Sequence, residues 1–372
     1  MNWNYMQPVK ICFGNGSVKS LNEIIDKVGG HKGLLICDGT FVKNGFANQL
    51  QQDSEGTLIQ LYSEVLPNTD VKSVDACADI IRNYNIDFVV ALGGGSVIDC
   101  GKAAATVCMT EDSICKYHGT GVTLPNKHIP LIAIPTTSGT GSEVTCVSVL
   151  TDYDLHKKAP VVSDSFYPEY AIVDPGLTYS VPPHITASTG LDVLSHAIEG
   201  YWSKGHQPIC DICAIHAAGY VFEYLERCYH NPYDKEAREK LSEASIIAGL
   251  SFSIPKTTSS HACSFPLTNL LGIPHGEACA LTLDYFARIN KDADGGRVQL
   301  FAKKLGFDNV DQMADRIVEM KKTMNMRMDL KDFSLTEEQV TELVKISRHP
   351  NLYNNPVDIT DEMLNDMYQQ LR

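Results

Sequence analysis

The feature that most limits the fold is a change in hydrophobic patterning near residue 180. Before it, short apolar runs alternate with amphipathic stretches, such as residues 71–83. The apolar runs are GLLIC at 33–37, DFVVAL at 87–92, LIAI at 131–134 and YAIV at 170–173. Uniformly apolar strands are typical of sheets covered on both faces, so the pattern predicts βαβ units around a largely parallel sheet.

After Pro182 and Pro183, helical periodicity dominates and strand-like runs almost vanish. Periodic stretches cover residues 185–202, 209–228 and 233–251, with several more toward the C-terminus. A chain of 372 residues is also long for a single hydrophobic core. We therefore expect two domains, an α/β N-terminal domain over 1–180 and an all-helical C-terminal domain over 181–372.

Charge and hydropathy narrow the class of partner. The 31 basic and 45 acidic residues give a formal charge of −14, which repels the phosphate backbone of nucleic acids. An anionic small molecule stays compatible with this balance, because a local basic pocket can hold it. No apolar run is long enough for a membrane span, and the segment MNWNYMQPVK lacks the apolar core of a signal peptide. We expect a cytoplasmic protein with neither nucleic-acid nor membrane partners.

The twelve cysteines are mostly scattered singly, which indicates reduced, buried thiols rather than a disulfide framework. One CxxC occurs at Cys210 and Cys213, within a helical pattern and without a second CxxC to complete a zinc ribbon. We interpret this pair as two core-facing thiols one helical turn apart.

Two segments that follow apolar runs have the composition of a phosphate-binding site. The first is Gly93–Gly94–Gly95–Ser96, which leads into a predicted helix whose free N–H groups would face an anion. The second is IPTTSGTGSEVT at 134–145, whose hydroxyls could bond phosphate and ribose. A glycine cluster alone is often a tight turn, and the second segment alone is an ordinary Ser/Thr-rich loop. Together they indicate a dinucleotide-binding domain with a nucleotide across two strand ends.

Asp38 directly follows the first of the apolar runs. A carboxylate in that place can accept bonds from a ribose diol and would repel a 2′-phosphate, which favours NAD over NADP. The alternative is a turn aspartate before Gly39. The local sequence supports both interpretations equally.

A carboxylate and three imidazoles in the helical half suggest a metal site. Asp192 and His196 stand four residues apart and share one helix face, while His261 and His275 lie fourteen residues apart farther along. This set suits Fe(II) or Zn(II). On spacing alone, a structural role for helical histidines is slightly favoured over a metal site. We interpret the other nine as surface or packing residues: His31, His118, His128, His156, His184, His206, His216, His230 and His349.

Six motifs in order give the chain a family resemblance over essentially its whole length. The motifs in this chain are PVKICFGNGS, GGGSVIDCGK, IPTTSGTGSEVT, VDPGLTYSVPP, GLDVLSHAIEG and HACSFPLTNLLGIPHGEACAL. With them the chain resembles the iron-containing, group III alcohol dehydrogenases. The resemblance implies a dinucleotide-binding N-terminal domain, a metal-binding helical domain and a homo-oligomer, expected as a dimer. It also implies hydride transfer between NAD(H) and a small aldehyde or primary alcohol, with the metal as a Lewis acid on the carbonyl.

Carried over by position, the resemblance implies the site residues. The expected metal ligands, which are also catalytic, are Asp192, His196, His261 and His275. The expected cofactor-binding residues are Asp38, Asn68, Gly94, Gly95, Ser96, Thr136, Thr137, Thr145 and Lys158, and Lys158 is expected to be catalytic as well. Asp38 matches the aspartate of NAD-preferring members, which favours NAD.

One position departs from the family pattern. Many members have a further histidine four residues after the third ligand, where this chain has Phe265. Proton delivery must therefore differ, for example through water or ribose hydroxyls. The segment from His261 to Asp284 is most similar to the branch that reduces phosphonoacetaldehyde to 2-hydroxyethylphosphonate. Arg288 and Lys158 are candidate cations for the phosphonate, although a solvated helix residue is the more common role for a single arginine.

Three alternatives remain. One is a reductase of lactaldehyde or 3-hydroxypropionaldehyde. Another is a lyase similar to dehydroquinate synthase, which would show no net NADH consumption. The third is a non-catalytic binding protein, against which the complete ligand set and the glycine loop both argue.

Overall fold

The computed structural model describes residues 3–372, which divide into two compact units. The α/β unit comprises residues 6–137 and 141–178. The helical unit comprises residues 179–372 together with residues 138–140 and 3–5. An α/β unit followed by a helical one is the fold class expected from the patterning.

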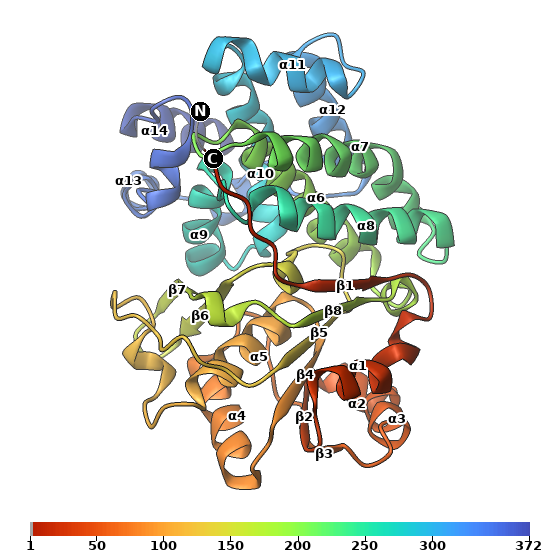
Figure 1. The fold of residues 1–372 in the computed structure, drawn as a ribbon. Helices are drawn as coiled ribbons and strands as arrows, with labels where there is room; N and C mark the ends of the chain where they lie inside the picture. The colour runs from red at the N-terminus through yellow and green to blue at the C-terminus, as the bar shows by residue number, and fades with distance from the viewer. Residues whose placement is uncertain (1–2) are drawn as a thin grey trace. The chain divides into compact units, whose positions relative to one another are not determined.

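The α/β unit is built on a six-stranded sheet in which every pair of neighbours is parallel (Figure 1). In spatial order the strands are β1 (Lys10–Phe13), β8 (Tyr170–Val173), β5 (Leu131–Pro135), β4 (Phe88–Gly93), β2 (Gly33–Cys37) and β3 (Leu58–Tyr62). The four apolar runs are confirmed as the interior strands. The edge strands β1 and β3 were not predicted, because their partly exposed sequences lack a uniform apolar run.

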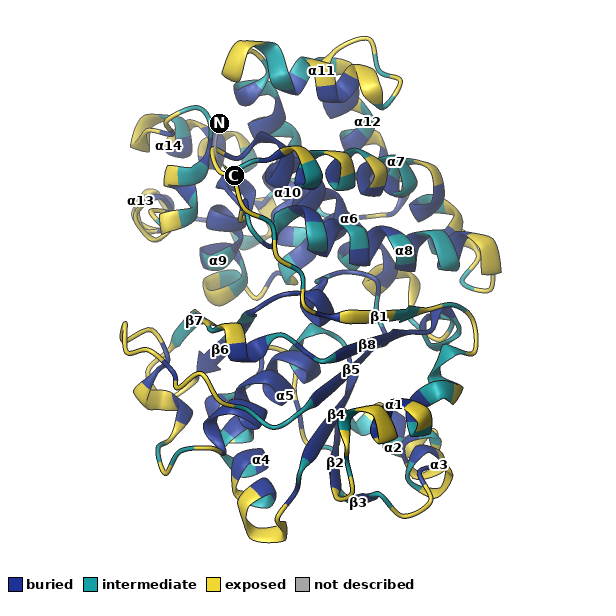
Figure 2. Ribbon diagram, in the orientation of Figure 1, coloured by how far each residue is buried: buried dark blue, intermediate teal, exposed yellow. Residues whose placement is uncertain are grey.

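Helices cover both faces of this sheet. Leu34 and Ile36 of β2 pack with α4 (Val71–Tyr84) and α5 (Gly95–Val107) in one apolar cluster. Leu35 and Cys37 of the same strand pack on the opposite face with α1 (Leu21–Val28), α2 (Gly39–Lys43) and α3 (Phe46–Asp53). Because successive side chains point to opposite faces, a strand covered on both sides is apolar throughout. Figure 2 shows these central strands as buried.

The chain order of the strands creates a switch point. From β2 the chain adds β3 on one side and then β4 on the other side of β2. In open parallel sheets, ligands bind beyond the carboxyl ends of the strands at such a point. The unit also contains an antiparallel pair that was not predicted, β6 (Val147–Asp152) and β7 (Lys157–Val162).

Nine long helices form the helical unit, and the three predicted stretches are among them (Figure 1). They are α6 (Pro183–Trp202), α7 (Pro208–His230), α8 (Lys235–Phe252), α9 (Ser259–Leu271), α10 (His275–Asn290), α11 (Arg297–Lys304), α12 (Val310–Thr323), α13 (Glu337–Ile346) and α14 (Asp361–Leu371). Proline at the first position starts α6 and α7 without losing an internal hydrogen bond.

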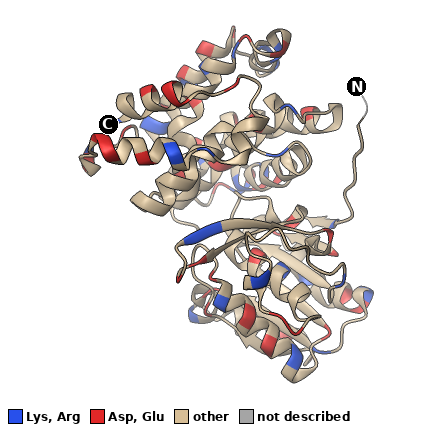
Figure 3. Ribbon diagram, turned by 90° about the vertical axis from the view of Figure 1, so that its left-hand side faces the viewer, with Lys and Arg blue, Asp and Glu red and all other residues tan. Residues whose placement is uncertain are grey.

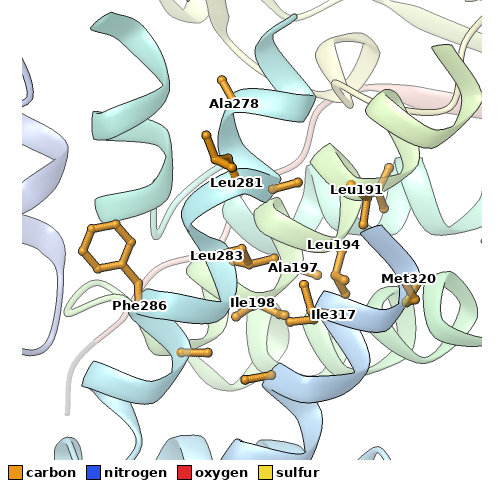
Figure 4. Packing of buried hydrophobic residues seen from close by; sticks show 14 of the residues in the cluster. Leu191, Leu194, Ala197, Ile198, Ala278, Leu281, Leu283, Phe286, Ile317 and Met320 are labelled. Carbon is orange, nitrogen blue, oxygen red and sulfur yellow. The ribbon is translucent and has the colours of Figure 1, made fainter. Parts of the chain in front are cut away.

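The core of this unit includes side chains of α6, α10 and α12. Figure 4 shows Leu194 and Ile198 of α6 beside Leu283 of α10 and Ile317 of α12. From Thr186 onward almost every residue of α6 is buried, so this helix is enclosed by others and carries its polar residues into the interior. A buried carboxylate or imidazole on α6 therefore requires partners.

No helix within residues 3–372 is both long and apolar enough to cross a membrane. In the view of Figure 3, basic and acidic residues are interspersed along both units.

Candidate metal centre and cofactor site

The two loops predicted to bind phosphate are brought together at the carboxyl ends of β4 and β5. Gly94 caps α5, which begins at Gly95, and the backbone N–H of Thr136 donates to the carbonyl of Gly93 at 3.1 Å. A Cβ on Gly93 would lie 2.5 Å from a methyl of Val97, and one on Gly94 would lie 3.3 Å from Oγ1 of Thr137. Glycine at these positions thus keeps the strand, loop and helix close. The arrangement leaves backbone N–H groups at a helix N-terminus, which is an anion-binding geometry.

A polar network extends from this helix start. The backbone N–H of Asn68, a residue with a left-handed φ of 59°, donates to Oγ of Ser96 at 3.1 Å. The ammonium of Lys158 donates to Oδ1 of Asn68 at 2.8 Å. Asn68 therefore links two other expected cofactor residues, Ser96 and Lys158. The cation of Lys158 reinforces the preference of the α5 N-terminus for a negative group.

Asp38 lies at the carboxyl end of β2, beside the switch point. Its Oδ1 accepts a hydrogen bond from the backbone N–H of Thr40 at 2.7 Å, so it is the N-cap of α2. A carboxylate can cap a helix with one oxygen and accept a ribose hydroxyl with its remaining capacity. Both interpretations of Asp38 are therefore compatible with its position.

Thr145 is 4% exposed, as is Thr136, and it takes part in a buried hydrogen-bond network. Lys102, which is fully buried, donates to Oγ1 of Thr145 at 3.1 Å, to Oγ of Ser142 at 2.7 Å and to the carbonyl of Val147. Burial lowers the pKa of Lys102 to about 8, although nearby Asp99 opposes the change. Thr145 thus belongs to a buried network beneath the loop.

In the helical unit, three helices contribute the predicted metal ligands. Asp192 and His196 lie on α6, His261 lies in the first turn of α9, and His275 is the first residue of α10. Gly276 allows α10 to approach α6, because a Cβ there would lie 2.1 Å from the carbonyl oxygen of Ser188.

The structure brings three of the four predicted ligands together with one residue that we had not predicted. The ligand atoms of Asp192, His261, His275 and Cys279 all lie within 4.8 Å of one another. Oδ1 of Asp192 is 3.6 Å from Nε2 of His261. A carboxylate, two imidazoles and a thiol are a donor set suited to a borderline divalent ion.

His196 lies beside this cluster. Its ring stacks on Phe252 at a centroid distance of 4.1 Å and on His261 at 4.6 Å. Burial lowers the pKa of His196 well below its ordinary value, and His261 and His275 lower it further. Neither Nδ1 of His196 nor Nε2 of His261 has a hydrogen-bond partner within residues 3–372. Buried ring nitrogens in this state fit a metal as the missing partner.

Glu199 was missed by the sequence analysis and holds His261 in place. Its carboxylate bonds Nδ1 of His261, and its Oε1 also accepts from the backbone N–H of Ser260 at 2.6 Å and from the hydroxyl of Thr258 at 2.9 Å. Burial alone would lower the pKa of His261, but Cys279 and Glu199 outweigh burial and raise it well above its ordinary value. A carboxylate on the far ring nitrogen is typical of metal-binding histidines. Its position seven residues after Asp192, on the same face of α6, was the available signal.

Phe265 lies near the metal cluster and contacts a histidine that we had interpreted as a packing residue. The ring of Phe265 is 6.3 Å from that of His275 and 4.5 Å from that of His349. Nδ1 of His349 accepts from the backbone N–H of Asn351 at 3.3 Å. A neutral ring therefore carries its proton on Nε2. The two residues are too far apart in sequence for any local pattern to pair them.

Arg288, by contrast, lies far from the cluster. It is thirteen residues after His275 on the same helix, roughly 20 Å away at the rise of an α-helix. Its guanidinium pairs with Asp315 at 2.8 Å and Asp311 at 3.4 Å. Arg288 is therefore a surface ion-pair residue, and the candidate role in binding a substrate anion at the metal was wrong.

Comparison with known proteins agrees with this geometry in both units. Residues 8–175 match the family model described as iron-containing alcohol dehydrogenase. Residues 186–371 match the C-terminal model of the Fe-containing alcohol dehydrogenase family. Together the two models cover the glycine loop and all four predicted metal ligands.

Individual relatives match most or all of the chain. Sulfoacetaldehyde reductase from Bifidobacterium kashiwanohense, whose crystal structure was solved in complex with NAD⁺, is 62% identical in sequence to this chain. The two structures superpose with a TM-score of 0.98, and the match covers 100% of this chain and 99% of the reductase. Choline dehydrogenase of Bacillus subtilis is 30% identical over 98% of this chain and 93% of its own. Sulfoacetaldehyde reductase of Bilophila wadsworthia is 32% identical over 81% of this chain and 78% of its own. The chain therefore belongs to the iron-containing alcohol dehydrogenase family.

Proposed function

We propose that this enzyme reduces sulfoacetaldehyde to 2-hydroxyethanesulfonate with NADH. The observation that carries the proposal is the 62% identity, over the full length of both chains, to the sulfoacetaldehyde reductase of Bifidobacterium kashiwanohense. Membership of an alcohol dehydrogenase family favours hydride transfer over the lyase and the non-catalytic alternatives.

The α/β unit supports NAD(H) as the cofactor. The start of α5, with Gly94, Gly95 and Ser96, offers N–H groups to a pyrophosphate, and Lys158 adds a cation beside it. Asp38 at the neighbouring strand end would accept a ribose hydroxyl and disfavour the 2′-phosphate of NADP. The relative from Bifidobacterium kashiwanohense was solved with NAD⁺.

The helical unit supports a divalent metal, Fe(II) or Zn(II), held by Asp192, His261 and His275 together with His196, whose ring stacks on that of His261. Such an ion supplies a Lewis acid that polarises an aldehyde carbonyl. Glu199 fixes the ring of His261 so that Nδ1 is occupied and Nε2 is left for the ion. The surrounding side chains exclude water, because the cluster is mostly buried.

Phosphonoacetaldehyde is the second candidate substrate, supported by the sequence resemblance of the segment from His261 to Asp284. It shares with sulfoacetaldehyde a two-carbon aldehyde bearing a tetrahedral anionic group. Lactaldehyde and 3-hydroxypropionaldehyde lack that charge, so they separate an anion-selective reductase from a general one. A dimer and a cytoplasmic location stay predictions.

The test is the rate of NADH oxidation by metal-reconstituted enzyme with each of the four aldehydes. We expect kcat/KM to be highest for sulfoacetaldehyde and at least about tenfold lower for the uncharged aldehydes, because a charge-assisted contact contributes roughly 1.5–3 kcal/mol. A higher value for phosphonoacetaldehyde would establish the second candidate instead. Equal values for charged and uncharged aldehydes would refute both and leave a general alcohol dehydrogenase.

A further inference from the structure

Three partly exposed rings lead away from the buried metal cluster within the helical unit. His275 is partly exposed, whereas Asp192 and His261 are buried. Of residues 259–267 in α9, Phe265 is the one that is not buried. Its ring lies 6.3 Å from that of His275 and 4.5 Å from the half-buried ring of His349. These three rings therefore mark the side on which the cluster approaches solvent.

His349 is held in place beside α9. It directly precedes a short 3-10 helix, Pro350–Asn354, and caps its start. In that helix, the side-chain amide of Asn351 donates to Oγ1 of Thr257 at 2.8 Å. Thr257 belongs to the segment that leads into α9, the helix that carries Phe265. The contact between the rings of His349 and Phe265 is thus supported by hydrogen bonds on both sides of it in the chain.

The hydrogen bonds of His349 leave its Nε2 available. Nδ1 accepts from the backbone N–H of Asn351 at 3.3 Å. Burial lowers the pKa of His349, although the side chain of Asn351 opposes the change, so the ring is neutral at neutral pH and carries its proton on Nε2. Within residues 3–372, no protein acceptor forms a hydrogen bond with that N–H. A half-buried donor in this state can serve a ligand.

The distance from the metal cluster suits the far end of a short substrate. Adding the two ring separations places the ring of His349 within about 11 Å of that of His275. Metal–ligand bonds of about 2 Å at one end and a hydrogen bond of about 2.9 Å at the other fit within this span together with a two-carbon chain. An aldehyde whose carbonyl faces the cluster can therefore extend its second carbon past Phe265 toward His349.

We propose that His349 binds the anionic head of the substrate, its Nε2–H donating to a sulfonate oxygen, and that this contact sets the preference for a charged aldehyde. The proposal deepens the proposed function and rests on it for the identity of the sulfonate. Phe265 provides the apolar wall beside the carbon chain. Arg288, the cation of this unit expected to bind the anion, is instead paired with Asp311 and Asp315.

The test uses variants of the full-length, metal-reconstituted enzyme. His349→Phe removes the donor and keeps an aromatic ring against Phe265, whereas His349→Gln retains an N–H donor. The control is His216→Phe, because His216 also packs on an aromatic ring, that of Tyr220 at 4.3 Å on its own helix α7.

We expect His349→Phe to lower kcat/KM for sulfoacetaldehyde at least about tenfold, since a hydrogen bond to a charged group is lost. The loss should appear mainly in KM, because the anionic head is bound in the ground state as well as in the transition state. Values for uncharged lactaldehyde should not change. His349→Gln should retain part of the preference for sulfoacetaldehyde, and His216→Phe should match the unmodified enzyme.

Ethanesulfonate, which has the anionic head but no aldehyde, tests the contact apart from the reaction. It should compete with lactaldehyde in the unmodified enzyme and in the control His216→Phe. Its inhibition constant should rise at least about tenfold in His349→Phe. If that variant does not fold, His349→Leu carries the same comparisons, because leucine also lacks a donor.

Several results would overturn the proposal. An equal loss for sulfoacetaldehyde and lactaldehyde in His349→Phe would reduce His349 to structural support. A preference for sulfoacetaldehyde that survives in this variant would refute the His349 contact and leave the proposed function intact. Conversely, if the unmodified enzyme reduces charged and uncharged aldehydes equally, the substrate assignment fails. In that case, inhibition by ethanesulfonate that depends on His349 would still support the anion contact, and absence of inhibition would refute it as well.

Discussion

Replacing Gly276 with alanine should disrupt the metal centre although no metal ligand is replaced. The added Cβ would lie 2.1 Å from the backbone oxygen of Ser188, and an ordinary contact needs at least 3.4 Å. Because the obstacle is backbone on α6, the two helices must separate by about 1.3 Å at this point, which is the difference between those distances. Metal–ligand lengths tolerate only about 0.2 Å of error.

The expected magnitudes follow from this displacement. Overpacking of a core typically lowers the free energy of unfolding by about 1–3 kcal/mol. For a unit of this size each kcal/mol shifts Tm by about 3 °C, so we expect Tm to decrease by roughly 3–9 °C. Metal occupancy should fall well below one ion per chain, because Asp192 is on α6 whereas His275 is on α10.

Gly219→Ala provides the matched control. Gly219 is also helical, within α7, but a Cβ there would meet only a methyl of Leu305 at an ordinary 3.7 Å. This change should leave occupancy unchanged and raise stability by up to about 1 kcal/mol through helix propensity. Differential scanning fluorimetry and elemental analysis measure both quantities. If Gly276→Ala matches Gly219→Ala in Tm and retains a full complement of metal, the argument from close helix approach is refuted.

Three further predictions address other parts of the molecule. In Asp38→Gly, the ratio of kcat/KM for NADPH to that for NADH should rise about tenfold. The reason is that a charge-assisted contact, or the corresponding repulsion, amounts to roughly 1.5 kcal/mol or more. An unchanged ratio would mean that Asp38 only caps α2. Burial raises the pKa of Glu143 from 4.5 to about 7. The contribution of the neutral carboxyl to the free energy of unfolding is therefore complete below pH 4.5, and it is lost as the pH rises through 7. The free energy of unfolding of Glu143→Gln should therefore not show the decrease of about 3 kcal/mol that the unmodified protein shows across that pH range. Parallel Tm profiles of the two proteins from about pH 4.5 to 8 would contradict this prediction. In Glu199→Gln, weaker orientation of His261 should lower metal affinity about 10–100-fold in chelator competition, whereas unchanged affinity would reduce Glu199 to a structural role.

Local patterns in the chain were sufficient for the interior strands and the main helices. Strands β2, β4, β5 and β8 are apolar at every position because helices cover both sheet faces, and that burial is visible in the residues themselves. The edge strands are different. In β3, LIQLY is mostly half-exposed, so its sequence carries no continuous apolar signal. Its strand conformation depends on pairing with β2, which lies far from it in sequence.

The same distinction applies to the site. Sequence spacing alone places Asp192, His196 and Glu199 on one face of α6, because residues four and seven apart fall on successive turns. The glycine loop after β4 was likewise readable, since its function depends on backbone that glycine leaves accessible. Which donors on other helices would meet that face of α6 could not be read in the same way.

Only the tertiary structure decided that Cys279 joins Asp192, that Glu199 orients His261, and that His349 lies against Phe265. Each of these contacts joins two segments whose separation is set by how closely helices pack. At Gly276 that packing depends on the absence of a single Cβ opposite the backbone of Ser188. Hydrophobic periodicity indicates which face of a helix is buried. How closely two buried faces approach depends on the side chains of both helices, so no single segment of sequence contains that information.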